Sequence, residues 1–103
     1  MTFTVWKYVV PVDDMDHTYE LDWGAPVLHV SAESPDLVTF WIENDTVGRK
    51  IDRKFRVFGT AHPIPHKAVW VGTVPIPSVG LVWHLYETTL WDEQDPAKLK
   101  GQK

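Results

Sequence analysis

The chain has 103 residues and no cysteine, which suits one domain and excludes disulfides, thiolate metal sites and a cysteine nucleophile. Its formal net charge of -4 disfavours nucleic acid and anionic membranes as partners, because both repel an acidic protein on average. Charged or polar residues interrupt every hydrophobic run, so we expect no segment that spans a bilayer.

Segments rich in β-branched and aromatic residues follow one another along the chain, separated by turns with glycine, proline, asparagine or aspartate. We predict strands at residues 3–10, 17–23, 27–32, 37–43, 51–60, 68–74 and 81–89. No helical pattern is long enough to connect parallel strands. The sequence therefore predicts an all-β fold, a single small antiparallel β-sandwich or barrel of about seven strands. This domain covers residues 1–90, and residues 91–103 form a C-terminal tail with a helical turn after Pro96.

Alternation within these segments divides the side chains between an inner and an outer face. We expect two groups to point inward, Val38, Phe40 and Ile42, and Ile51, Phe55 and Val57. In the two preceding strands, the residues that share one face are Tyr19, Leu21 and Trp23, and Leu28, Val30 and Ala32. In the first segment, Trp6 and Tyr8 face opposite to Val5 and Val9, and the alternation alone leaves open which pair is inside.

Histidines offer a possible zinc site, since three imidazoles can bind the metal when their nitrogens converge. His62 and His66 are separated by the spacing that aligns two ligands on a helix, and His84 lies on a later strand. Pro63 and Pro65 exclude a helix at that point. We therefore favour a rigid loop whose rings form hydrogen bonds, and we expect no metal.

Acidic residues also have a structural explanation. The run 13–16 lacks the ligand spacing and the glycine of a calcium loop, so it is interpreted as a solvated turn. Paired carboxylates would suggest glycoside hydrolysis, but a domain of this size has little room for a sugar-sized cleft. The carboxylates in question are Glu20, Asp22, Glu43 and Glu87. We expect no cofactor and no catalytic residue, and interpret the protein as non-enzymatic.

Aromatic residues on predicted outer faces are the most informative signal. Trp41 points outward if its neighbours in the strand point inward, and Phe58 points outward beside Arg56. Aromatic side chains beside an arginine are typical of protein interfaces. The predicted binding residues are Trp41, Arg56, Phe58, Trp6, Tyr8 and His62. Partner binding, a homodimer and intramolecular cover, with Trp91 over Trp41, all remain open explanations of the same surface.

Several stretches resemble a family of short uncharacterised proteins found in actinobacteria and their tailed phages. Their order and spacing, more than any single motif, carry the resemblance. They are Trp6-Lys7-Tyr8 with Pro11-Val12, Val27 to Val30, Phe55 to Thr60 with His62-Pro63-Ile64, Val71 to Val74, and Leu81 to Glu87. The tail from Thr88 onward departs from the shorter members. The resemblance implies an actinobacterial phage or prophage as the source and no particular mechanism.

These observations together favour a non-enzymatic phage accessory protein in the cytoplasm of the infected bacterial cell. It would bind a host bacterial protein through the surface around Trp41, Arg56 and Phe58, with an unpaired edge strand adding main-chain pairing. The first alternative is a minor virion component or a self-associating β module. The second is a small enzyme or a sugar-binding module that uses Trp41.

Overall fold

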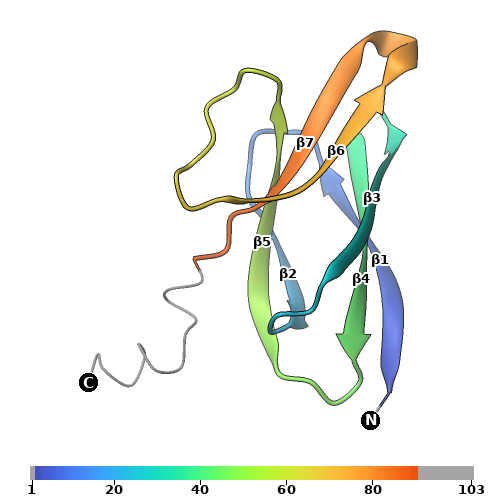
Figure 1. Ribbon diagram of the computed structural model, residues 1–103, viewed down its shortest axis with the longest axis vertical. Helices are drawn as coiled ribbons and strands as arrows, with labels where there is room; N and C mark the ends of the chain where they lie inside the picture. Colours follow the sequence, from blue (N-terminus) through green and yellow to red (C-terminus); the bar gives the residue numbers. More distant parts are fainter. Residues whose placement is uncertain (1, 91–103) are drawn as a thin grey trace.

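The computed structural model describes residues 2–90 and contains two antiparallel sheets that face each other (Figure 1). The three-stranded sheet has the order β1-β4-β3, and the four-stranded sheet has the order β2-β5-β7-β6. The strands are β1 (Phe3–Pro11), β2 (His17–Asp22), β3 (Val27–Ser34), β4 (Leu37–Asp45), β5 (Lys50–Gly59), β6 (Val69–Ile76) and β7 (Leu81–Glu87), with a 3-10 helix η1 (Pro77–Val79) before β7.

The predicted all-β sandwich is confirmed, and it is an open sandwich and not a closed barrel. Every predicted strand is present, with ends that differ by a few residues. The predicted helical turn after Pro96 lies outside the described residues. Within residues 2–90, no helix has the length and apolar character needed to cross a membrane.

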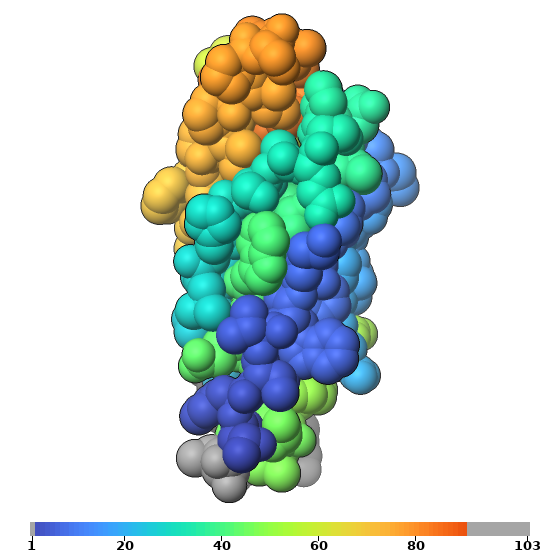
Figure 2. Space-filling model, turned by 90° about the vertical axis from the view of Figure 1, so that its right-hand side faces the viewer, coloured from blue at the N-terminus to red at the C-terminus, as the bar shows by residue number. Residues whose placement is uncertain are grey.

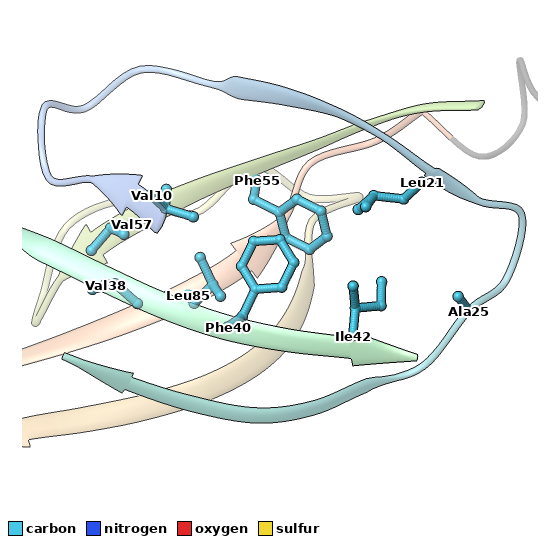
Figure 3. Close-up of a cluster of buried hydrophobic side chains, with 9 residues drawn as sticks. All are labelled: Val10, Leu21, Ala25, Val38, Phe40, Ile42, Phe55, Val57 and Leu85. Atoms are coloured by element: carbon cyan, nitrogen blue, oxygen red, sulfur yellow. The ribbon is translucent and has the colours of Figure 1, made fainter. Parts of the chain in front are cut away.

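Aromatic rings from both sheets form the centre of the core (Figure 3). Phe40 of β4 stacks on Phe55 of β5 with ring centroids 4.6 Å apart, which joins the two sheets. Tyr8 and Tyr19 each lie against Phe40, at 5.5 and 5.6 Å. The surrounding buried residues are Val10, Leu21, Ala25, Val38, Ile42, Val57 and Leu85. The inward faces predicted for β4 and β5 are therefore confirmed.

Two residues depart from the faces predicted for their strands. Leu28 is the extra residue of a bulge, since Val27 pairs with Ile42 and His29 pairs with the next residue of β4. The bulge interrupts the alternation, and the Leu28 side chain is 50% exposed. Trp23 lies beyond the end of β2 and is partly exposed.

One end of the sandwich contains a buried ion pair on the inner face of the four-stranded sheet. Arg53 Nε and Nη2 donate to the two oxygens of Glu87 at 2.8 and 2.7 Å. Arg53 Nη1 also donates to the carbonyl oxygens of Asp22 and Ala25. The strand β7 ends at Glu87. The Thr89 hydroxyl donates to Glu87, and this bond holds residue 89 beside the sheet. The pair fastens the β2–β3 connection to β5 and β7.

Candidate protein-binding site

Trp41 lies on the outer face of the three-stranded sheet, the face turned to the viewer in Figure 2. Its neighbours across the sheet are Lys7 on β1 and His29 on β3. The imidazole of His29 lies 5.5 Å from the indole, centroid to centroid, and the Trp41 side chain is half-buried. The outward direction predicted for Trp41 is confirmed.

Arg56 and Phe58 lie on the opposite outer face of the sandwich, which belongs to the four-stranded sheet. Phe58 is only 5% exposed, because the Tyr86 ring packs edge-on against it and the Arg56 guanidinium lies 5.7 Å from its centroid. Arg56 is itself held by Asp16, with Nε 2.9 Å from Oδ1. The structure therefore does not bring Trp41, Arg56 and Phe58 into one surface. Phe58 takes the outer face, but its own neighbours cover it.

The histidines predicted to form a loop do not converge on a common point. His62 is exposed, and its ring lies close to the backbone of Gly59. The two ring nitrogens of His84 lie 3.1 and 3.0 Å from the hydroxyls of Thr60 and Thr73. Among residues 2–90 there is no cluster of three or more histidine, aspartate or glutamate side chains placed to hold a metal.

Trp6 and Tyr8 share the inner side of β1, but their surroundings differ. Tyr8 packs against the core rings, whereas Trp6 lies nearer the end of the strand and is 56% exposed. The Trp6 indole N–H donates to Thr4 Oγ1 at 2.8 Å. The question left open by the alternation is settled: Tyr8 is the inner residue, and Val5 points outward with a 57% exposed side chain.

The sandwich has four edge strands, and three of them are protected against pairing with another chain. β3 and β6 both contain bulges, and they approach each other so closely that a Cβ at Gly72 would lie 2.7 Å from Val30 Cγ2. β6 also carries Pro75. β2 is the shortest strand, with six residues. β1 differs from all three, because its nine residues pair with β4 in an unbroken register.

Within residues 2–90, the main chain of β1 pairs with β4 on one side, and no other strand pairs with it on the other. Thr2 O accepts from Thr46 N, and Val12 N donates to Asp36 O, so the even-numbered residues direct their main-chain groups towards β4. In an antiparallel strand the next residue directs its N–H and C=O the other way. The odd-numbered residues Phe3, Val5 and Lys7 therefore present unpaired donors and acceptors at the edge.

The side chains of this segment do little to block pairing. Phe3 and Val5 are 56% and 57% exposed on the outer face. Lys7 is the one charged residue of β1, and an edge lysine usually discourages pairing. Its ammonium group, however, crosses the outer face to Glu33 on β3, with Nζ 2.7 Å from Oε1. The charge is thereby directed away from the free edge.

Tyr19 closes the open edge at Val9. Its hydroxyl donates to Val9 O at 2.6 Å. Burial, together with the negative charge of Asp13, raises the pKa of Tyr19 to about 12 from its ordinary value of 10.0. A hydrogen bond from His17 to Asp13 in turn lowers the pKa of that carboxyl. The phenol therefore remains protonated and keeps its donor over the whole physiological range.

We expect alkaline pH to weaken the fold through Tyr19. The unfolded chain loses the phenolic proton near pH 10 and the native chain near pH 12, so the native state holds more protons between these values. The free energy of unfolding should therefore fall as pH rises through this window. Urea unfolding of the wild type and of Tyr19→Phe at several pH values checks this. The difference between the two proteins should shrink with rising pH, and a constant difference would contradict the role of Tyr19.

A cleft of about 370 Å³ lies directly beneath the free edge, on the inner side of β1. The inner-side residues of β1 form one wall, and the rest comes from β2, the end of β4, the β4–β5 connection and the start of β5. The lining residues are Thr4, Trp6, Tyr8, Glu20, Asn44, Asp45, Thr46 and Lys50. Of the residues predicted from the sequence, the structure brings Trp6 and Tyr8 together here. Phe3, Val5 and Glu20 also belong to the site, although no motif in the sequence marks them.

Fold and site define a small antiparallel β-sandwich with one regular open edge strand beside an aromatic cleft. The chain belongs to the family described as Domain of unknown function (DUF7352), whose sequence model matches residues 1–96. The predicted membership of an uncharacterised family is thereby confirmed. No curated protein and no solved structure matches the chain. The family description names no activity.

Proposed function

We propose that this protein is a non-enzymatic binding protein that adds an extended segment of a protein partner to the free edge of β1. The observation that carries the proposal is the contrast among the edges. Among the edge strands that residues 2–90 form, β1 is the one that is both long and regular, and Phe3 and Val5 on its outer face are more than half exposed. Edge strands of this kind pair with other chains unless something blocks them.

Strand addition accounts for both the affinity for a partner and its recognition by alternating side chains. Main-chain hydrogen bonds form at Phe3, Val5 and Lys7, and alternate side chains of the added strand lie on the two faces of the sheet. Those on the outer face meet Phe3 and Val5, which are the exposed apolar residues there. Those on the inner face meet the cleft that contains Trp6 and Tyr8. The partner is thus recognised as an extended segment with a particular alternation.

Trp41 extends the same surface across the sheet. It is the outer-face neighbour of Lys7. When a partner strand binds to β1, the partner residues that follow this strand therefore contact Trp41. Arg56, Phe58 and His62 take no part in this surface. Arg56 and Phe58 lie on the other outer face, where Asp16 and Tyr86 already engage them.

The resemblance described above supports a biological setting for this binding. We propose an accessory protein of an actinobacterial phage or prophage, made in the bacterial cytoplasm, with a host protein as the partner. β1 would recognise an exposed, extended segment of such a host protein.

A random linear peptide library, panned against the immobilised protein, tests strand addition. Peptides recovered from it should shift the backbone amide resonances of Phe3, Val5 and Lys7. Val5→Pro should weaken their binding at least about tenfold, because it removes an edge donor without touching the pairing with β4. Val5→Thr is the matched control, since it is β-branched and keeps the N–H, and should bind within about twofold of the wild type.

Equal binding by Val5→Pro and the wild type would refute strand addition at β1. A monomer–dimer equilibrium that Val5→Pro abolishes would show that the edge pairs with a second copy of the chain. Sedimentation of both proteins without peptide distinguishes this result from binding of another protein.

The host setting is tested separately. Actinobacterial lysate is passed over the wild type, Val5→Thr and Val5→Pro. The proposed partner should be a protein retained by the first two and lost by Val5→Pro. Identical sets of retained proteins on all three would contradict a host partner that uses this edge.

A further inference from the structure

Glu20 of β2 stands at the rim of the cleft under β1, because it alternates with the inward-facing Tyr19 and Leu21, and no basic group among residues 2–90 pairs with it. Glu20 lines the cleft and forms no hydrogen bond or ion pair with any other residue between 2 and 90. Its partner across the sheet on β5 is Asp52, another carboxylate. Like charges directly opposite each other on two strands are unfavourable. The fold therefore keeps an arrangement that a cation would relieve.

Lys50, the basic residue of the cleft, is already engaged. Its ammonium group forms an ion pair with the buried carboxylate of Asp22 and also donates to Asp45 O at 3.0 Å. The Asp45 side chain accepts from Val47 N within its own turn. Glu20 is thus the lining carboxylate that has no side-chain partner among residues 2–90.

Aromatic rings complete the site. The indole N–H of Trp6 is occupied by Thr4, so a ligand meets its ring and not its donor. Tyr8 is held in place by stacking on Phe40, with centroids 5.5 Å apart. Tryptophan is the aromatic side chain that attracts cations best, and the exposed half of Trp6 lies in the same cleft as Glu20.

We infer that the cleft is the specificity pocket of the β1 edge and accepts a basic side chain, arginine above all, from the added strand. This inference rests on the proposed strand addition. Every second residue of an added strand points to the inner side of the sheet, where the cleft lies. A planar guanidinium suits this place, because it stacks on an aromatic ring and binds a carboxylate through paired N–H groups. The net charge of -4 favours the same choice of partner.

The test uses the tightest peptide of the library selection. Its residue nearest the Trp6 ring, identified by nuclear Overhauser contacts, is replaced by arginine, glutamine or glutamate, and affinities are measured by calorimetry. Arginine should exceed glutamine by about tenfold, the combined effect of an exposed ion pair and an exposed cation–π contact. Glutamate should bind more weakly than glutamine. The arginine preference should decrease with added salt.

Glu20→Gln should reduce the preference for arginine over glutamine to less than about twofold. Asp36→Asn is the matched control, because it removes the same charge from the turn between β3 and β4, away from the cleft, and should keep the full preference.

The possible failures are distinguishable. Equal affinity for arginine and glutamine peptides, with binding still lost in Val5→Pro, would overturn the basic pocket and leave strand addition standing. A preference that survives Glu20→Gln would also overturn the pocket. Failure of every peptide to bind would overturn the proposed function and the pocket together.

Discussion

Glu87→Gln is expected to lower the free energy of unfolding by about 3–5 kcal/mol, because it leaves the charge of Arg53 buried without its partner. Both side chains are less than one-tenth exposed, and the guanidinium donates to both oxygens of Glu87 through Nε and Nη2. A domain of this size has roughly 5–15 kcal/mol of total stability, so the expected loss is a large share of it. Chemical denaturation with urea, followed by tryptophan fluorescence, measures the change.

Two controls distinguish the cost of leaving a buried charge unpaired from the cost of losing an ion-pair contact. Glu33→Gln breaks the exposed pair with Lys7 and should change stability by less than about 1 kcal/mol. The double variant Arg53→Met with Glu87→Leu removes both charges and should recover most of the loss. Similar losses in Glu33→Gln and Glu87→Gln would contradict the buried pair.

Phe40→Ala is expected to cost about 3–5 kcal/mol, because the ring lies at the centre of the aromatic cluster that joins the sheets. The alanine leaves a cavity between Phe55 and Tyr8 that the rigid strands cannot close. Phe40→Leu keeps most of the volume and should lose clearly less. Calorimetric unfolding of both variants checks the order, and equal losses would place Phe40 outside the packed centre.

Much of the fold follows from local patterns. The alternation around Phe40 and Phe55 predicts their burial, since each strand of a two-sheet sandwich turns every second residue towards the other sheet. The same alternation correctly places Trp41 on an outer face. It fails at Leu28, because a bulge shifts the faces and leaves no clear mark in the sequence.

The candidate site could be predicted only in part. Alternation indicates that Trp41 and Phe58 both point outward, but which sheet each strand joins depends on pairing between distant segments. The two residues therefore lie on opposite faces, and Phe58 is covered by Tyr86. The free edge of β1 is likewise a product of strand order. Trp6 was identified from its type, whereas its exposure follows from its place beside the cleft.

Amide hydrogen exchange of the free protein in dilute solution, followed residue by residue by NMR, tests the open edge of β1 most directly. The amides of Thr4, Trp6 and Tyr8 should exchange slowly, because they pair with β4, and those of Phe3, Val5 and Lys7 should exchange quickly. Addition of a bound peptide should slow the second group. Slow exchange of Phe3, Val5 and Lys7 in the free protein would mean that the edge is already covered, which would contradict a site for a partner strand.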